Sequence, residues 1–496
     1  MRGAPLAASL LIPSRTDLAA LAVELVLTAG ICAVLLVPLV FRTRANVLAS
    51  AAATAAVAVG FLLTFAAPSG SGTAFAGMIV FDGAALLWRR IALLFVLGVL
   101  IARWPRGDDT ERDDTVDCTL LLSATVGMTL MGATANLLLV LLASELASVA
   151  SYLLAGLRKH ERLASEAALK FVLVGAVSTA VMAYGISLLY GVTGSFDFAA
   201  IAAHLSAGSV SPLAVMGLVG LLVGLLFKLS AVPMHFWAPD VFQGGGVDVA
   251  AFLSVVSKGA GVVLLARLVA LLVAPGAPLI GGTQFTLAII AIATMTVGNV
   301  AALPQTSVKR MLGYSTIAQG GYLLAAVALI GPAGFEATAI YLMVYAAMNL
   351  GAFAVLASVE AARRSDHVDA FNGLARLAPA SAAAMAVCLI ALIGLPPTAG
   401  FFAKWKIMSA LAAGGGWWWA AVAAVALNSV ISVAYYARLI RAMYLRSALT
   451  SAGENLAPPG WSPATWVGVA SAIALVAGLV LFTFVERAAA RFTFGS

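Results

Sequence analysis

Long apolar stretches recur along almost the whole chain and are separated by short polar connections. Each stretch approaches or exceeds the roughly 20 residues that a helix needs to cross the hydrocarbon core of a bilayer. Only 10% of the 496 residues are charged and 62% are hydrophobic, whereas soluble domains are about 25% charged. A water-soluble globule could not hide so much apolar surface. The sequence therefore excludes a cytosolic enzyme, a nucleic-acid binder and a disordered chain, and it indicates an integral membrane protein.

The apolar runs predict about fourteen spans. Open β-structure is not viable in lipid, and the runs show no alternation, so each span is expected to be a helix. The predicted fold class is all-α, a polytopic membrane protein in which residues 1–496 form a single membrane domain. The predicted spans are 18–40, 46–67, 85–104, 117–133, 136–157, 165–190, 212–238, 249–273, 283–303, 307–330, 335–360, 380–411, 417–444 and 463–486.

Positive charges divide the connections between these spans into two sets. The odd-numbered connections, the seventh excepted, carry lysine or arginine, and the even-numbered ones carry none. Because positive loops stay in the cytoplasm, the pattern predicts a multi-pass protein of the cell inner membrane with both termini on the non-cytoplasmic side. The residues concerned are Arg42, Arg44, Arg103, Arg106, Arg112, Arg158, Lys159, Arg162, Lys309, Arg310, Arg363, Arg364, Arg376, Arg438, Arg441 and Arg446.

Two stretches are too interrupted to be simple spans. They are LLFKLSAVPMHFWAPD at 225–240 and LIGLPPTAGFFAKW at 392–405, and each combines a proline break with a lysine. Paired interruptions of this kind point to an ion pathway in transporter folds. We therefore expect two structural repeats, 117–273 and 283–444, each containing one broken helix.

Four ionisable residues lie inside predicted spans among apolar neighbours: Glu145, Lys228, Lys258 and Lys404. One charge at the bilayer centre costs about 2.5–3.5 kcal/mol, so four facing lipid would cost roughly 10 kcal/mol. Structural ion pairs or snorkelling side chains would explain single cases. Because two of the lysines accompany helix breaks, we favour a polar interior that carries protons.

The neighbours of these charges suit proton exchange. Ser148 and Tyr152 share a helix face with Glu145. Pro233 donates no N–H, so the carbonyl of Leu229 is expected to lose its helical partner close to Lys228. Burial and a nearby carboxylate have opposite effects on the proton affinity of a lysine. A lysine whose glutamate partner moves away could therefore release its proton.

Two further residues are weaker candidates for the proton path. Lys170 has Glu166 four residues before it, an arrangement that suits an ordinary ion pair as well as a proton carrier. His235 follows the first break and could relay protons, because histidine titrates near neutral pH, or it could simply be packed. Asp240 is interpreted as a turn cap, and Lys406 as an interfacial residue.

No cofactor or metal motif is found in the sequence. The three cysteines and four histidines are scattered, and no P-loop or GxGxxG motif following a strand is present. We expect Cys32, Cys118 and Cys388 to be small buried apolar residues. The motifs of the chain thus predict no nucleotide, flavin, cluster or metal ion bound to it.

Four segments together resemble a known family. They are FKLSAVPMHFWAPDVFQGG at 227–245, AFLSVVSK at 251–258, GNVAALPQTSVKRMLGYSTIAQGGY at 298–322 and GLPPTAGFFAKW at 394–405. They resemble the subunit N family of bacterial NADH–quinone oxidoreductase, respiratory complex I, and more widely the antiporter-like membrane subunits. The resemblance covers residues 144–405, and HFWAPDVFQG at 235–244 favours subunit N over its antiporter-like siblings.

The resemblance implies roles for individual residues. Glu145 and Lys228 would form a switching pair, and Lys258 would link this pair to Lys404 along a hydrated axis. The family's lysine of the sixth span would be Lys170, and its histidine after the break would be His235.

The resemblance also implies an assembly. NADH, FMN, iron–sulfur clusters and quinone would be bound by partner subunits, and none of them by this chain. Its neighbours would be subunits M, K, J and A and the lipid bilayer, with no nucleic acid.

Two positions depart from the family pattern. Gln319 stands where the family usually has histidine, so a titrating relay is not expected at this position, whereas a water-bridged relay is. FQGGGVDV at 242–249 replaces a proline-containing turn and adds Asp248.

Two alternatives stay open beside subunit N. One is a subunit of a Mrp-type cation/proton antiporter or of a membrane-bound hydrogenase. The other is a structural scaffold without pumping, which Gln319 favours and the four retained charges oppose.

Overall fold

The computed structural model describes residues 13–41, 44–66, 71–104, 113–158, 161–207, 210–272, 279–447 and 460–494. Arg42, Arg106, Arg112 and Lys159 of the predicted cytoplasmic connections lie outside the described residues, as do both chain ends and the last residues of the predicted spans 46–67 and 249–273.

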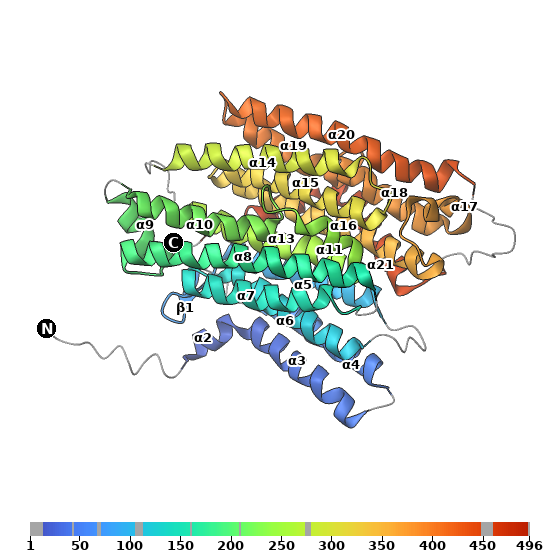
Figure 1. The fold of residues 1–496 in the computed structure, drawn as a ribbon, viewed down its shortest axis with the longest axis horizontal. Coiled ribbons are helices and arrows are strands. Elements are labelled where there is room, and N and C mark those ends of the chain that lie inside the picture. The colour runs from blue at the N-terminus through green and yellow to red at the C-terminus, as the bar shows by residue number, and fades with distance from the viewer. Residues whose placement is uncertain are drawn as a thin grey trace.

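The described residues form a bundle of roughly aligned helices (Figure 1). Twelve helical segments of the described residues are long and apolar enough to cross a membrane, and they match twelve of the predicted spans. One of them is the continuous segment Val247–Leu272, which comprises α12, a π-helical turn and α13. The other two predicted spans are α15, which is more polar, and the interrupted span 380–411, which divides into α18 and α19. The all-α, polytopic fold class is confirmed. The helices are α2 Arg15–Ala20, α3 Ala22–Val40, α4 Ala45–Ala66, α5 Gly83–Ala102, α6 Asp114–Ala133, α7 Leu137–Ala155, α8 Arg162–Thr193, α9 Phe198–Ser206, α10 Pro212–Leu229, α11 Trp237–Gly244, α12 Val247–Phe252, α13 Lys258–Leu272, α14 Ile280–Ala302, α15 Val308–Ala328, α16 Pro332–Arg363, α17 Leu374–Leu377, α18 Pro379–Ile393, α19 Ala399–Ala413, α20 Trp418–Leu445, α21 Pro463–Val480 and α22 Phe482–Ala489, with a 3₁₀ turn at Val368–Phe371.

Both predicted breaks are present, but neither helix ends at a proline. Helix α10 ends at Leu229, and Ser230 takes the left-handed conformation with φ 53°, three residues before Pro233. Helix α18 ends at Ile393, and Gly394 is left-handed with φ 86°. A left-handed residue lets the chain leave the helix while its N–H groups still reach the last carbonyls. The left-handed residues thus end the helices, and the prolines after them prevent the helices from continuing, because proline has no N–H to donate.

The span predicted at 249–273 contains a feature that apolar length does not reveal. Between α12 and α13 the residues Leu253–Ser257 form a π-helix, and Lys258 follows it directly. A π-helical turn is rare and is found mostly at functional sites. It places Lys258 at the point where the regular helix resumes.

The connections gather at two opposite ends of the bundle (Figure 1). A short antiparallel hairpin, β1 Gly72–Ala74 paired with β2 Ile79–Phe81, lies at one end together with α9. The even-numbered connections supply both of these elements. Helix α17, from an odd-numbered connection, lies at the other end. The hairpin was not predicted from the sequence, because its strands are only three residues long.

Buried ion pairs hold several spans together. Arg267 of α13 lies 2.6 Å from Asp82, the N-cap of α5, and both side chains are buried. Arg89 of α5 pairs with Glu24 of α3. All three cysteines are free; Cys118 and Cys388 are buried as expected, but Cys32 is exposed on α3. The limits 117–273 and 283–444 of the two repeats stay a prediction.

Candidate functional site

Lys228 lies at the end of α10 and its ammonium group bonds to α7. Its Nζ donates to the carbonyl oxygen of Ser144 at 3.0 Å and to Oγ of Ser148 at 2.7 Å. The residue is 5% exposed. Both partners are neutral, so a buried ammonium is solvated here by hydroxyl and carbonyl oxygens.

Glu145 is only half-buried, and Thr179 of α8 donates to its Oε1 at 2.7 Å. Glu145 and Lys228 both lie in the described part of the chain, and their side chains form no ion pair within 4.0 Å. Because Lys228 bonds to residues directly before and one turn after Glu145, the expected pair is near but open. The hydroxyl of Tyr152 lies against Gly175 and makes no hydrogen bond of ordinary geometry within the described residues.

Lys258 is fully buried and reaches the first helix break. Its Nζ donates to Oγ of Ser230, the left-handed residue that ends α10, at 3.1 Å. The rings of Trp237 and Phe242, both on α11, lie 5.7 Å and 5.4 Å from the same nitrogen. An ammonium over aromatic faces is stabilised without water. The two halves of the first broken helix thus enclose Lys258.

Lys404 binds the second helix break in a comparable way. It is 2% exposed, and its Nζ donates to the carbonyl oxygens of Leu392 and Ile393, at 2.9 Å each. These two carbonyls have no backbone partner at the end of α18, where a cation also interacts favourably with the helix dipole. Ser429 at 3.3 Å and the ring of Tyr322 at 4.4 Å complete the environment.

Gln319 bonds to a tyrosine on one side and, on the other, to a carbonyl that also binds Lys404. Tyr341 donates its hydroxyl to Oε1 of Gln319, and Nε2 of Gln319 donates to the carbonyl of Leu392 at 3.3 Å. That carbonyl also accepts from Lys404. Toward Lys258, the hydroxyl of Tyr345 donates to the carbonyl of Ser254 at 3.0 Å. A discontinuous line of polar groups therefore runs between the two lysines.

Sequence reasoning missed the tyrosines and amides that surround this line. Tyr341 and Tyr345 are one turn apart on α16, a spacing that could have identified them. Asn299 bonds to Tyr322, Asn428 and Tyr435, with distances of 2.9–3.2 Å. Only the fold brings these residues together, since they come from three different helices.

Within the described residues, Lys170 and His235 form no hydrogen bond with Lys228, Lys258 or Lys404. Nζ of Lys170 contacts Asp240 at 2.7 Å and Glu166 at 2.8 Å, and its side chain is 44% exposed. These contacts favour the ion-pair interpretation of Lys170. His235 is buried, and its Nδ1 has no hydrogen-bond partner within the described residues. Asp240 forms ion pairs with basic side chains of two helices, so its interpretation as a simple turn cap is not supported.

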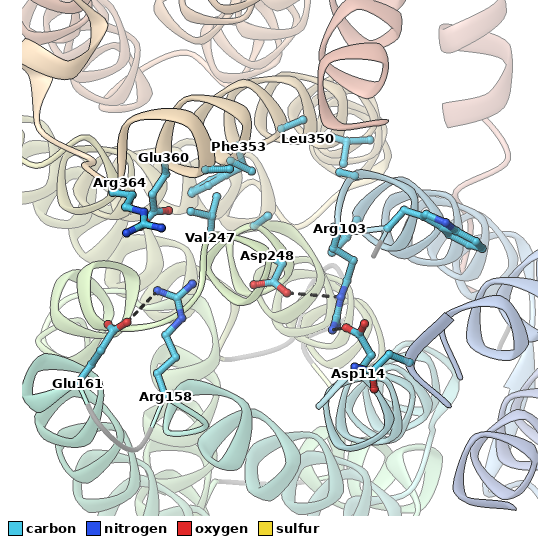
Figure 2. A pocket seen from close by; sticks show the side chains of 18 of the residues that line it. Arg103, Asp114, Arg158, Glu161, Val247, Asp248, Leu350, Phe353, Glu360 and Arg364 are labelled. Carbon is cyan, nitrogen blue, oxygen red and sulfur yellow. Dashed lines mark hydrogen bonds and ion pairs between the residues drawn. The ribbon is translucent and has the colours of Figure 1, made fainter. Parts of the chain in front are cut away.

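A cavity of about 490 Å³ lies at the start of α12, at the same end of the bundle as α17 (Figure 2). Arg103 lies between Asp114 at 3.0 Å and Asp248 at 3.6 Å. Burial opposes its charge, but Asp248, Cys118, Asp117 and Asp114 together hold the pKa of Arg103 above its usual range. Asp248, one of the departures from the family pattern, thus fixes the first turn of α12 to α5 and α6.

Within the described ranges, no three histidine, cysteine or acidic side chains lie close enough together to hold a metal ion. The polar groups of the site are ammonium, hydroxyl, amide and carbonyl groups and one carboxylate. Such groups can bind and pass protons and water.

Several known proteins are similar to this chain over most of its length. The family model described as "NADH:quinone oxidoreductase/Mrp antiporter, TM" matches residues 134–432. NADH-quinone oxidoreductase subunit N 2 of Sorangium cellulosum is 43% identical over 413 residues, which cover 80% of this chain and 81% of that protein. Subunit N of Rubrobacter xylanophilus is 39% identical over 446 residues, covering 87% and 89%.

Solved structures show the same fold. A chain of respiratory complex I from Thermus thermophilus with bound aureothin has a TM-score of 0.78 and 31% identity, and 95% of this chain and 99% of that chain are covered. A chain of the Mrp complex from Dietzia has a TM-score of 0.81 with 19% identity over 96% and 97%, a likeness of fold alone. This chain belongs to the NADH:quinone oxidoreductase/Mrp antiporter family of membrane proteins, and within it to the subunit N family.

Proposed function

We propose that this chain is the proton-translocating subunit N of an NADH–quinone oxidoreductase. It would couple electron transfer from NADH to quinone in partner subunits to proton movement through its own buried residues. One observation carries the proposal: three lysines that are at most 5% exposed each lie at a helix break or bond to one. A charged group in lipid is expensive and is retained mainly where it has a function.

Glu145, Lys228, Lys258 and Lys404 are the residues that we expect to transfer protons. The open arrangement of Glu145 and Lys228 supports a switching pair. The ammonium of Lys228 donates to the hydroxyl of Ser148 and not to the carboxylate of Glu145, so the pair could close. Lys258 would receive the proton next, and the Tyr345–Tyr341–Gln319 line with bound water would lead to Lys404. Coupling needs an element with two arrangements that partner subunits bias, and the broken helices are the candidates.

The cavity of Figure 2 is a suitable cytoplasmic approach. Val247 and Ala251 line it, and both belong to the segment that continues through the π-helix to Lys258. By the positive-inside pattern, this end of the bundle would be in the cytoplasm and both termini would be on the other side of the cell inner membrane.

The chain would act as one subunit of an enzyme. NADH, FMN, iron–sulfur clusters and quinone would be bound by partner subunits, and subunits M, K, J and A would be its membrane neighbours. A Mrp-type antiporter or membrane-bound hydrogenase is less well supported, because the likeness to the Mrp complex is one of fold at 19% identity. A pure scaffold would not need three buried lysines.

The assembly is tested by affinity purification from the native membrane in mild detergent. NADH–quinone reductase activity, flavin and iron–sulfur signals should co-elute with the chain. If only membrane subunits co-elute and no redox centre is present, the antiporter alternative replaces the proposal.

Proton transfer is tested by substitution in the assembled complex. Lys228→Ala and Lys404→Ala should lower proton pumping in inverted vesicles by tenfold or more. Lys406→Ala is the matched control, because Lys406 lies on the same half-helix but pairs with Glu336 and Glu486 near the surface. Full pumping by both test variants would contradict the mechanism.

A further inference from the structure

Helix α11, the second half of the first broken helix, is held by charges from two sides. Asp240 accepts from Lys170 of α8 at 2.7 Å through Oδ2 and from Nη1 of Arg310, on α15, through Oδ1. Arg310 also donates to Gln243 at 3.1 Å. We refer to Lys170, Asp240 and Arg310 as the α11 clamp. It connects helices that are far apart in the sequence through one carboxylate.

Two aromatic residues of α11 cover Lys258. At 100° per residue, Phe242 lies about 160° around the helix from Asp240, whereas Trp237 lies about 60° from it. Trp237 and Phe242 are both buried, and their rings are those that lie over the ammonium of Lys258. Trp237 is also stacked on Phe171 of α8, with ring centroids 4.2 Å apart. The same short helix therefore carries both the clamp and the aromatic cover of Lys258.

Helix α11 has little intrinsic means of holding its position. It has eight residues, follows an irregular break and has no side-chain cap at its N-terminus. A helix of that length is not stable alone in water, so its orientation depends on tertiary contacts. Those contacts are the aromatic packing of Trp237 and the ion pairs of the clamp.

We propose that Asp240 is a positioning residue for proton transfer: the α11 clamp fixes α11 so that Trp237 and Phe242 keep Lys258 dry, and a shift of the clamp admits water to this lysine. The inference rests on the proposed function, because only the proposed function requires Lys258 to exchange a proton. It assigns to Asp240 a role that acts through α11 and not through contact with the transferred proton.

The exposure of the clamp argues against a mainly stabilising role. The side chains of Lys170, Arg310 and Asp240 are 44%, 27% and 23% exposed. Ion pairs that are open to solvent contribute little to stability. The clamp is therefore expected to set the geometry of α11 more than the stability of the protein.

The test uses the assembled complex in inverted membrane vesicles. Asp240→Asn removes the charge and keeps the size of the side chain. We expect normal assembly and normal electron transfer from NADH to an artificial acceptor, with a severalfold lower ratio of protons pumped to electrons transferred. Asp240→Glu should recover most of that ratio. Glu336→Gln is the matched control, an acid of similar exposure paired with Lys406, and it should leave the ratio unchanged.

A second set of measurements separates positioning from general damage. Hydrogen exchange of the peptide spanning residues 237–244 should be faster in Asp240→Asn. The double variant of Asp240→Asn with Lys258→Ala should pump no less than Lys258→Ala alone, because both changes act on one step. If Asp240→Asn fails to assemble, Lys170→Gln and Arg310→Gln each remove one arm of the clamp and should each lower the ratio.

The outcomes are distinguishable. If Lys228→Ala and Lys258→Ala pump fully, the proposed function fails. If those variants lose pumping while Asp240→Asn, Lys170→Gln and Arg310→Gln pump fully with unchanged exchange, the clamp inference alone is overturned. Additive losses in the double variant would also overturn it.

Discussion

Lys404 completes the end of a helix to which it does not belong. Its ammonium pairs two carbonyls that α18 leaves open, while its own backbone is in α19. Gly394 makes this arrangement possible. Its φ of 86° is a conformation that residues with side chains rarely adopt, and a Cβ there would lie 2.7 Å from Cδ of Lys404. The turn and the lysine are therefore fitted to each other.

Gly394→Ala should consequently displace Lys404. The left-handed backbone costs about 1–2 kcal/mol for a residue with a Cβ, and the contact adds a shift of the lysine. We expect a modest loss of thermal stability and a several-fold loss of pumping in vesicles. Gly415→Ala is the matched control, because Gly415 has φ 64° but no atom near the added Cβ. Equal pumping by the two variants would show that Lys404 does not depend on this turn.

Gln319 is a non-titrating residue at a position that we propose as part of the proton relay. Its amide accepts from Tyr341 and donates to the carbonyl that Lys404 also uses. A glutamine can bridge bound water but cannot hold a proton, so the relay would pass protons through water and hydroxyl groups.

Gln319→Leu should therefore lower pumping strongly while the complex still assembles. The change leaves a buried tyrosine hydroxyl without its acceptor, which costs about 1–3 kcal/mol. It also removes the polar group that would hold water between Tyr341 and Lys404. Pumping and thermal stability are measured together. Gln284→Leu serves as the comparison, because Gln284 also donates to a carbonyl, that of Leu329, but has no tyrosine partner. Unchanged pumping in Gln319→Leu would mean that protons bypass this residue.

At the scale of elements, the sequence predicts whatever depends on apolar length and on proline. The two broken helices are examples, because a lysine and a proline inside an apolar run cannot be accommodated by a regular helix in lipid. The residues that end the helices, Ser230 and Gly394, were not predicted. Serine seldom takes a left-handed conformation, so its position becomes evident only in the folded chain.

The π-helix and the hairpin could not be predicted for different reasons. The π-helix of Leu253–Ser257 adds no unusual residue type, and tertiary packing decides where one extra residue is inserted. The hairpin of β1 and β2 is too short to show a period. Among the site residues, the lysines were predicted because charge is rare in an apolar run, whereas Tyr341 and Asn299 were missed because neutral polar residues are common in spans.

Helix α11 illustrates why contacts between elements are the least predictable level. Its residues Trp237 and Phe242 belong to a motif that the sequence displays openly, yet the meaning of the motif depends on Lys258, Lys170 and Arg310 from three other helices. No local pattern contains that information. The break isolates α11 from α10, and tertiary contacts then decide what it covers.

At the scale of the whole molecule, the alternation of the connections agrees with the described bundle. The hairpin and α9 lie at one end and α17 lies at the other, as an even number of spans between same-side connections requires (Figure 1). The orientation of the bundle in the membrane rests on the positive charges alone. Arg363, Arg364 and Arg376 gather at the α17 end, which should therefore be cytoplasmic.

Labelling single cysteines from each side of the membrane tests count and orientation together. Ser206→Cys at the end of α9 and Arg376→Cys on α17 are both exposed positions. The background is Cys32→Ser, because Cys32 is the exposed native cysteine and Cys118 and Cys388 are buried. A membrane-impermeant maleimide should label Ser206→Cys in spheroplasts and Arg376→Cys only in inverted vesicles. Labelling of both from one side would contradict the number of spans, whereas exchanged sides would keep the count and reverse the orientation, placing the cavity beside Asp248 on the side to which protons are released.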